Sequence, residues 1–287
     1  MKYIFSNILG SFVIDEQKKT ISKEKGEYKE LPAEKYPLAL ELLKDQQYFA
    51  DFHTSNLSKT KKDIKASVSQ DHLITQAISN IGEIEKVRNL LSKRVREWYS
   101  LYFPELEEKI ESHEHFIEAI SGKTREQLIK EFKLKSEMGS DLKKEDVDEI
   151  LEVAVQIQNL TALQEKHEKY LEAIMKKHCP NILELAGVTI GARLLEIGKG
   201  LKHLAMLPAS TIQLLGAEKA LFRHLKTGAK SPKFGVIMQH QVVQKAKEKG
   251  KAARALADKL SLCARIDYFK GEAKAAEYKK ELEKRFL

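Results

Sequence analysis

The sequence predicts a mainly α-helical protein in three parts. Residues 1–69 are expected to form a small N-terminal α/β domain, residues 70–180 a long antiparallel coiled-coil helical hairpin, and residues 181–287 an all-helical C-terminal domain. Charged residues make up 32% of the 287-residue chain, which is typical of exposed helical faces. Apolar residues recur at helical spacing after residue 70, whereas strand-forming residues gather near the N-terminus.

The N-terminal part begins with a segment rich in β-branched and aromatic residues, Lys2 to Ile14, followed by turn residues and charge. This pattern predicts one or two short strands. Pro37 can open a helix. The helix then carries apolar residues on one side at Leu38, Leu42, Leu43 and Phe49. The Lys and Ser residues after Asn56 indicate a connector to the second part.

The second part begins with a long amphipathic helix from Asp71 to Tyr102, which Pro104 ends. Its apolar residues lie on one face, namely Ile74, Ile78, Ile81, Ile84, Val87 and Leu91. Two further helices are expected at about 105–132 and 145–178, separated by a segment with turn residues. We expect these two helices to form a helical hairpin.

The second arm of this hairpin has an apolar seam with heptad spacing at Val147, Ile150, Ala154 and Ile157. The next two seam positions are the polar Thr161 and Gln164, while Leu160, Leu163 and Tyr170 lie one residue away. Such drift is typical of a 3.6-residue helix set against a strict heptad. We interpret the arm as an intramolecular coiled coil with a second stripe available for another copy of the chain. Ordinary bundle helices are the alternative.

Positive charge is concentrated in the last third of the chain. The formal net charge is +8, with an isoelectric point near 9.1. Residues 187–270 hold 16 Lys and Arg against 5 Asp and Glu, whereas the remainder holds 34 against 37. A polyanion, with a phosphate backbone ahead of a membrane, is therefore the first partner to consider.

The segment 216–230, GAEKALFRHLKTGAK, carries a basic stripe. On a helical wheel, Lys219, Arg223, Lys226 and Lys230 fall within about 60° of one another. The roughly opposite arc is apolar and is expected to pack into the domain; it consists of Leu214, Ala217, Leu221, Phe222, Leu225 and Ala229. The helix is thus predicted to have a buried face and a cationic face.

Glu218 belongs to neither face. Near a helix N-terminus its carboxylate is favoured by the macrodipole and by free N–H groups. The other interpretation is that Glu218 projects from the helix start and contacts a cationic partner protein while the neighbouring lysines meet phosphate.

The basic stripe predicts nucleic-acid binding, with a solvated surface face as the alternative. Further cations follow nearby and add charge that an anion would relieve, namely Lys233, Lys245, Lys247, Lys249, Lys251 and Arg254. The aromatic residues among them are few, Phe222 and Phe234, so backbone contacts should dominate over base stacking.

Three stretches carry a family resemblance. The stretch LPASTIQLLGAEKALFRHLKTGAK at 207–230, together with GVIMQH at 235–240 and GKAARALADKLSLCARID at 250–267, closely resembles the Nop domain of box C/D ribonucleoprotein core proteins, in particular the short archaeal form. The helix that starts at Asp71 resembles a helix of the same family. The resemblance covers nearly the whole chain.

This resemblance implies a scaffold for site-specific 2′-O-methylation of rRNA. Its N-terminal domain would hold a fibrillarin-type methyltransferase, its coiled coil would self-associate, and its Nop domain would bind a guide RNA kink-turn already occupied by a ribosomal-protein-like kink-turn-binding protein. S-adenosylmethionine is expected on the methyltransferase, and no cofactor on this chain. The expected location is the cytoplasm in an archaeon or the nucleolus in a eukaryote.

The resemblance also assigns residues by position. The contact with the kink-turn-binding protein maps onto Gly216, Ala217, Glu218 and Lys219. The segment that approaches the guide RNA maps onto Ala220, Leu221, Phe222 and Arg223. The RNA-binding set comprises Lys219, Arg223, Lys226, Lys230, Lys233, Gln239, Lys251 and Arg254. The chain departs from the family pattern at Gln241 and Lys249, which puts the loop after Gln239 in doubt.

Other classes of protein have weaker support. The two cysteines, Cys179 and Cys263, lack the spacing of a disulfide framework or zinc site. Glycines at 187, 191, 198 and 200 follow no predicted strand, so close helix packing explains them better than a methyltransferase cofactor loop. No apolar run is long enough for a membrane span. A Nop-domain splicing factor and a free-standing RNA methyltransferase remain as alternative functions.

Overall fold

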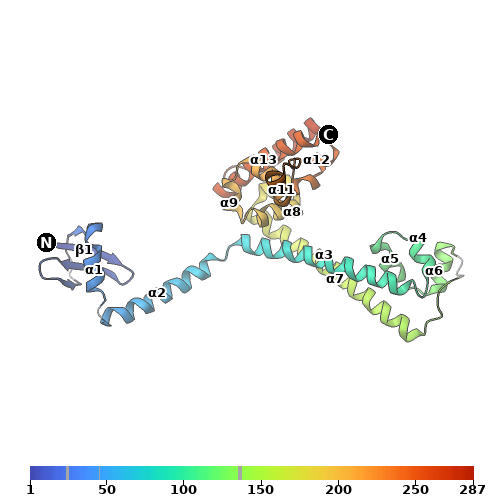
Figure 1. Ribbon diagram of the computed structural model, residues 1–287, viewed down its shortest axis with the longest axis horizontal. Coiled ribbons are helices and arrows are strands. Elements are labelled where there is room, and N and C mark those ends of the chain that lie inside the picture. The colour runs from blue at the N-terminus through green and yellow to red at the C-terminus, as the bar shows by residue number, and fades with distance from the viewer. Residues whose placement is uncertain (24–25, 45, 135–137) are drawn as a thin grey trace. The chain divides into compact units, whose positions relative to one another are not determined.

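The computed structural model describes residues 1–23, 26–44, 46–134 and 138–287. They form two compact units, Met1–Ser69 and Gln70–Leu287 (Figure 1). The division of the second unit at residue 180 stays a prediction. The fold is mainly α-helical, with a small N-terminal sheet, and this confirms the predicted fold class.

The N-terminal unit contains a four-stranded sheet in the order β3-β2-β1-β4. The strands are β1 (Lys2–Asn7), β2 (Gly10–Asp15), β3 (Thr20–Ser22) and β4 (Lys29–Glu30). β2 pairs antiparallel with β1 and β3, and β4 pairs parallel with β1. The expectation of one or two strands was too low, because strands of two or three residues show no alternation that a sequence pattern can reveal.

Helices follow this sheet as the 3-10 helix η1 (Ala33–Lys35), α1 (Tyr36–Leu42) and α2 (Gln46–Ser67). Pro37 lies at the start of α1, as expected, and Ile14, Leu31 and Ala39 form the buried centre of the unit. The segment after Asn56, expected to be a connector, is the second half of α2, since Lys is a good helix former. Phe49 lies on α2 and is exposed rather than packed on the α1 side.

The long helical hairpin of the second unit consists of α3 (Gln70–Tyr99) and α7 (Lys144–His178). The two helices are antiparallel, since Asp71 contacts His178 at 2.7 Å and Asn80 contacts His167 at 3.2 Å (Figure 1). A coiled-coil pair is therefore present, but its first arm is α3 and not the expected helix at 105–132. The sequence pattern of α7 predicts an apolar seam, but it does not predict which helix packs against that seam.

The segment 105–132 is not one helix. It forms α4 (Pro104–Lys109), α5 (His113–Ile120) and α6 (Arg125–Phe132) at the far end of the hairpin (Figure 1). Ser112 caps α5, and a capping box between Thr124 and Gln127 starts α6. These caps satisfy N–H groups at two new helix starts, so the chain forms separate short helices here.

A hydrophobic cluster holds α4, α5 and α6 against the hairpin. It includes Phe103, Leu106, Phe116, Ile120 and Leu128 from the short helices and their links, with Val95, Tyr99, Ile150, Ala154 and Ile157 from α3 and α7. The buried guanidinium of Arg96 donates hydrogen bonds to the carbonyl oxygens of Glu107 and Glu111 and lies 4.9 Å from the ring centroid of Phe116. Arg96 thus replaces water at the irregular link between α4 and α5.

The seam of α7 stays on the inward side beyond Ile157. Thr161 and Gln164 are partly buried, and Leu171 and Met175 are fully buried. Leu163 and Tyr170 are exposed, so the second stripe faces away from α3. On α3 the predicted apolar face is correct from Ile74 to Ile84, but Val87 is exposed.

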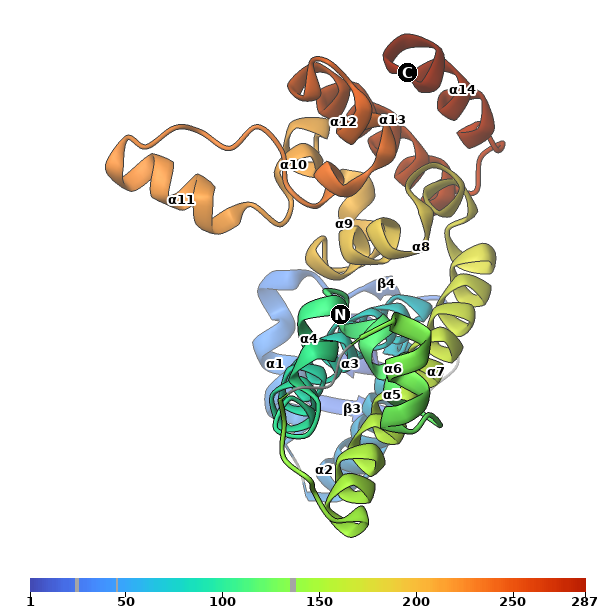
Figure 2. The same cartoon turned by 90° about the vertical axis from the view of Figure 1, so that its right-hand side faces the viewer.

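The C-terminal region packs around one long helix, α13 (Lys249–Phe269) (Figure 2). Around it lie α8 (Pro180–Ile197), α9 (Leu201–Met206), α10 (Ala209–Leu214), the 3-10 helix η2 (Val236–Gln239), α12 (Gln241–Lys245) and α14 (Ala275–Phe286). α8 is kinked at Gly187, where φ is 77°. The first turns of α3 and the last turns of α7 share this core.

A buried carboxylate connects three of these helices. Asp267 on α13 accepts hydrogen bonds from the backbone N–H groups of Asn181 and Ile182, at 3.1 and 2.9 Å, and from the Asn181 side chain at 2.8 Å. The Asn181 amide oxygen in turn accepts from the N–H groups of Lys274 and Ala275. The starts of α8 and α14 are therefore both capped inside the core.

A second polar contact fastens the hairpin to the C-terminal region. Asp71 on α3 hydrogen-bonds with His178 at the end of α7 and accepts from the backbone N–H of Leu201 at the start of α9. Burial raises the pKa of the Asp71 carboxyl, but the hydrogen bonds from His178 and Leu201 outweigh it, and the net pKa is lowered. One side chain thus holds three helix ends.

Replacing Asp267 should destabilise the second unit. Asp267→Ala leaves two buried backbone N–H groups without an acceptor, so we expect the free energy of unfolding to fall by about 3 kcal/mol. Urea unfolding followed by circular dichroism measures this loss. Asp258→Ala, an exposed position on the same helix, is the control. Equal stability of the two variants would contradict the capping role.

The contribution of Asp71 should depend on pH. Its folded-state pKa lies below the ordinary value of about 3.9, so its stabilisation is present above that value and is lost as pH falls through the lower folded-state pKa. Asp71→Asn should cost about 1 kcal/mol at pH 7 and progressively less as the pH falls below about 4. Urea titrations of both proteins across pH 2.5–7 test this, and a pH-independent difference would refute it.

Candidate nucleic-acid interface

The candidate site centres on α11 (Glu218–Thr227), which stands out from the rest of the C-terminal region (Figure 2). The helix begins after Gly216 and ends at Gly228, which adopts the left-handed conformation at its C-terminus. None of its residues is buried. α11 is therefore held by its two chain connections and offers nearly all of its surface to a partner.

Three cations form the basic stripe of α11. Lys219, Arg223 and Lys226 are all exposed and project from one face of the helix. Lys230 is also exposed, but the helix ends at Thr227, so the predicted helical placement of Lys230 was wrong. Because the helix ends at Gly228, the helical wheel does not describe the position of Lys230. Within the described part of the chain, none of these four cations forms an ion pair with a carboxylate.

The apolar face of α11 does not pack into the domain. Phe222 is 66% exposed and Leu225 is 74% exposed, while Leu221 is partly buried. The prediction of a buried face was wrong because helical periodicity gives the direction of an apolar stripe and not the molecule that covers it. Exposed large apolar side chains beside unpaired cations are the composition of an interface.

Glu218 makes a local contact at the start of α11. Its Oε1 atom accepts a hydrogen bond from the backbone N–H of Gly216 at 2.7 Å. Gly216 precedes the N-cap Ala217, so this contact holds the turn before the helix, and the carboxylate lies where the macrodipole favours it. The Glu218 side chain is exposed, and its predicted contact with a partner protein stays a prediction.

A second basic feature lies at the base of the segment that carries α11. It is a hollow of about 910 Å³ whose lining includes five cations: Lys233, Lys247, Lys249, Lys251 and Arg254. Lys251 pairs with Glu248 at 2.8 Å. The first turn of α13 contains no acidic residue, so the positive end of its macrodipole adds to the charge of these lysines. This hollow, called the basic hollow below, is suited to an anion.

The basic hollow contains three of the predicted RNA-binding residues, Lys233, Lys251 and Arg254. It also contains Lys247 and Lys249, which the predicted site omitted although their charge was noted. Gln239 lies elsewhere, in another hollow lined by His240, Gln241 and the kinked part of α8. The lysines at every second position from 245 to 251 were the sequence feature that pointed to this hollow. The sequence alone does not show which of them line it, because that depends on how α12 and α13 pack.

His240 fixes the turn that leads into α12, next to Gln241. The Nδ1 atom of His240 accepts from the backbone N–H of Val242 at 3.2 Å, and Nε2 lies 3.0 Å from the carbonyl oxygen of Leu185. Burial lowers the pKa of the His240 imidazole. A neutral ring that donates from Nε2 and accepts at Nδ1 fits both contacts, so His240 caps α12 and closes the kink of α8.

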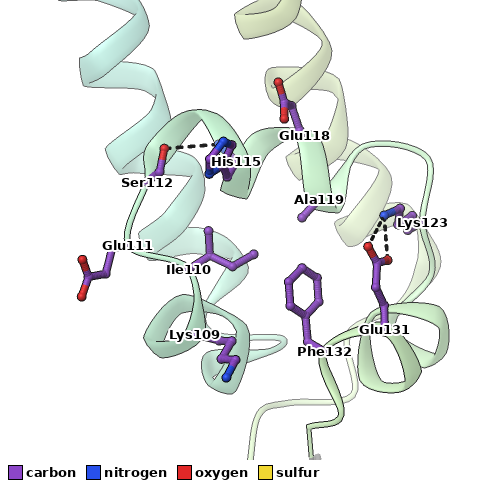
Figure 3. A pocket seen from close by; sticks show the side chains of 10 residues that line it. All are labelled: Lys109, Ile110, Glu111, Ser112, His115, Glu118, Ala119, Lys123, Glu131 and Phe132. Carbon is purple, nitrogen blue, oxygen red and sulfur yellow. Dashed lines mark hydrogen bonds and ion pairs between the residues drawn. The ribbon is translucent and has the colours of Figure 1, made fainter.

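The hollow at the tip of the hairpin has a different chemistry. At the tip of the hairpin, a hollow of about 660 Å³ has an apolar floor of Ile110, Ala119 and Phe132 and a rim of mixed charge that includes the ion pair Lys123–Glu131 at 2.7 Å (Figure 3). This rim lacks the single sign of charge that a polyanion requires.

Among the described residues, no group of three or more His, Cys, Asp or Glu is arranged to hold a metal ion.

Of the glycines at 187, 191, 198 and 200, Gly187 forms the kink of α8, Gly191 lies in regular helix, and the other two lie in the turn between α8 and α9. Gly191 lies inside α8, where an added Cβ would lie 2.9 Å from Cε of Met175 and 3.1 Å from Cγ2 of Ile182. At Gly191, this is the close packing that the sequence favoured over a cofactor loop.

None of the helices in the described ranges combines the length and apolar character needed to cross a bilayer.

Comparison with known proteins identifies the family. Residues 80–287 match the Nop family model, described as "snoRNA binding domain, fibrillarin". Over 252 residues the chain is 44% identical to an uncharacterized NOP5 family protein of Methanocaldococcus jannaschii, covering 81% of this chain and 61% of that protein. It is 38% identical over 215 residues to nucleolar protein 58 of Schizosaccharomyces pombe, covering 69% of this chain and 42% of that protein.

The chain thus spans less than two thirds of the length of these two relatives. A solved structure of a fibrillarin/Nop5p complex contains a chain that is 20% identical to this one with a TM-score of 0.48, over the full length of both chains. The family model covers well over half of the residues, and the chain therefore belongs to the Nop family.

Proposed function

We propose that this chain is the scaffold of a box C/D guide RNA ribonucleoprotein. In this proposal, the C-terminal region binds a kink-turn RNA together with the ribosomal-protein-like protein bound to it. The N-terminal unit recruits a fibrillarin-type methyltransferase, which brings S-adenosylmethionine and methylates rRNA at 2′-oxygens. This chain positions the other components and supplies no catalytic group.

The observation that carries the proposal is the two-sided exposure of α11. Lys219, Arg223 and Lys226 present unpaired positive charge, and Phe222 and Leu225 present apolar surface on the same short helix. An RNA backbone can neutralise the cations, but it leaves the apolar side chains in water. A composite of RNA and a bound protein covers both kinds of surface, so it is the partner that fits this helix best.

The basic hollow supports contact with an extended nucleic acid. Its five cations add to the stripe of α11, and Lys233 lies on the chain segment that leads back from that helix. Phosphate contacts of this kind fix the orientation of an RNA without reading its sequence. We therefore assign Lys247 and Lys249 to the RNA-binding set alongside Lys233, Lys251 and Arg254.

Recruitment of the methyltransferase is assigned to the N-terminal unit on two grounds. The family description names fibrillarin, and the matched range begins at residue 80, which leaves the small α/β unit available for a separate role. This unit exposes several large apolar side chains, namely Tyr36, Leu40, Phe49 and Phe52. Capture of a fibrillarin-type methyltransferase by the full chain also separates this proposal from a splicing-factor role.

Loss of one stripe cation should weaken assembly without harming the fold. We expect Arg223→Ala to reduce affinity for a guide RNA carrying the kink-turn-binding protein by about tenfold, and to lower the slope of log affinity against log salt by about 1, because one phosphate contact is removed. Electrophoretic mobility shifts over a series of salt concentrations measure both quantities. Circular dichroism should show an unchanged fold.

The matched control is Arg94→Ala, which removes an equally charged and exposed side chain from α3. This variant should bind like the wild type. If Arg223→Ala also retained the wild-type affinity and salt slope, α11 would not be the RNA-binding element. If neither the RNA nor the RNA–protein composite bound the wild-type chain, the proposed function itself would fail.

We also propose that the hairpin mediates self-association. The second stripe of α7 supports this, because Leu163 and Tyr170 are two turns apart on one exposed face while the seam toward α3 is occupied by other residues. On α3, Leu73, Val87 and Leu90 are exposed as well. Deleting most of α7 is an unsuitable test, since Leu171 and Met175 belong to the core of the C-terminal region.

Point substitutions therefore test self-association more cleanly. The double variant Leu163→Glu/Tyr170→Glu places two carboxylates on the stripe and should sediment as a monomer at concentrations where the wild type associates, because burying them in an interface costs several kcal/mol. Lys169→Glu changes the net charge by the same amount on a different face of α7 and should leave association intact. Identical sedimentation of all three proteins would exclude this surface.

A further inference from the structure

The segment that carries α11 leaves and rejoins the domain at a single crossing of the backbone. This segment, residues 216–234, is called the arm below. At its base the backbone N–H of Gly235 donates to the carbonyl oxygen of Gln213, and the N–H of Val236 donates to the carbonyl oxygen of Leu215, both at 2.8 Å. The side-chain amide of Gln213 donates to the carbonyl oxygen of Lys233. Three hydrogen bonds thus join the two ends of the arm.

The crossing is too close for side chains. A Cβ atom at Gly235 would lie 1.9 Å from the carbonyl oxygen of Leu215 and 2.7 Å from its carbonyl carbon, and backbone atoms cannot move aside as a flexible side chain can. Gly216 has a φ of +88°, and its Cβ would lie 2.5 Å from Cγ2 of Val236. Both positions therefore require glycine. At Gly235 the reason is the contact with the backbone of Leu215, and at Gly216 the reasons are the contact with Val236 and the positive φ.

Apart from Phe234, which is partly buried against the core next to the crossing, no side chain of the arm is packed against the core. α11 has no buried residue, and its polar contacts are internal to the arm. Glu218 accepts from Gly216, the Thr227 hydroxyl donates to the carbonyl oxygen of Arg223, and the His224 ring contacts the carbonyl oxygen of Ala229. These contacts stiffen the arm, but they do not attach it to the core.

We propose that the backbone crossing at Gly216 and Gly235 sets the direction of α11, and that Gly235 is a positioning residue for the ligand that α11 binds. The crossing itself rests on the core, since an added Cβ at Gly216 would also lie 3.5 Å from Cδ1 of Ile197 on α8. The identity of the ligand rests on the proposed function. The effect of the crossing on the direction of α11 is independent of the proposed function, so the direction and the ligand can be tested separately.

The direction of α11 is measurable without any ligand. Spin labels at Lys226→Cys on α11 and Asp258→Cys on α13 occupy exposed positions, and electron–electron double resonance gives the distribution of distances between them. Cys179 and Cys263 are fully buried, and burial raises the pKa of both thiols, so the native cysteines stay unlabelled in the folded chain.

Gly235→Ala should broaden or shift this distribution in the otherwise folded full-length chain, whereas the wild type should give one narrow peak. Gly271→Ala is the matched control, because a Cβ there meets Ile266 only at 3.7 Å, an ordinary contact. A purely stabilising role for Gly235 would lower the unfolding temperature but leave the distances in the folded protein unchanged. A narrow, unshifted peak in Gly235→Ala would therefore overturn the proposal.

Binding gives the second readout. Affinity of Gly235→Ala for the complex of guide RNA and kink-turn-binding protein should fall at least about tenfold, and that of Gly271→Ala should match the wild type. Wild-type affinity in a Gly235→Ala protein with altered distances would show that direction does not matter for recognition and would also overturn the proposal. Failure of the wild type to bind would instead refute the proposed function and leave the distance result standing.

A milder variant covers the case in which Gly235→Ala does not fold. Gln213→Leu removes one of the three hydrogen bonds at the crossing and leaves both glycines in place. It should broaden the distance distribution to a smaller extent, with circular dichroism unchanged. A distribution identical to that of the wild type would count against the crossing as the element that sets the direction of α11.

Discussion

The buried carboxylate of Asp267 is the interaction on which the C-terminal region depends. A helix start carries N–H groups that have no partner within the helix, and burying such an end is costly unless an acceptor meets it. Asp267 and Asn181 provide these acceptors for α8 and α14 in succession. Ile197, the last residue of α8, lies beside the chain crossing from which α11 extends.

Hydrophobic burial holds most helices of this unit in place, whereas α11 is held by its chain connections. The helices around α13 are held by a continuous apolar core, whereas α11 keeps Phe222 and Leu225 in solvent and depends on the two ends of the arm. An interface helix benefits from this arrangement, since apolar surface that is not used internally remains available for a partner. The direction of the helix can still be well defined, because two peptide chains in contact leave little freedom at its base.

Much of this organisation was predictable from the sequence. Heptad spacing identified α7 and its inward residues, and the clustered lysines identified the cationic region, since both are local patterns. The partner of α7 and the exposure of Phe222 were not predictable, because each depends on which surface meets the pattern. The short helices α4, α5 and α6 were missed for another reason: Ser112 and Thr124 act as caps only when the chain turns there. Long-range contacts such as Asp71 with His178 have no local signal at all.

The hairpin helices each belong to two separate apolar clusters. Ile150, Ala154 and Ile157 pack with the short helices, while Leu171 and Met175 pack with the C-terminal region, and Thr161 and Gln164 lie between them. Continuous helices joined by a polar middle need not melt as one body. The distal half can unzip while the proximal half stays closed, so amide protons along α7 should exchange in two cooperative groups divided near Thr161 and Gln164.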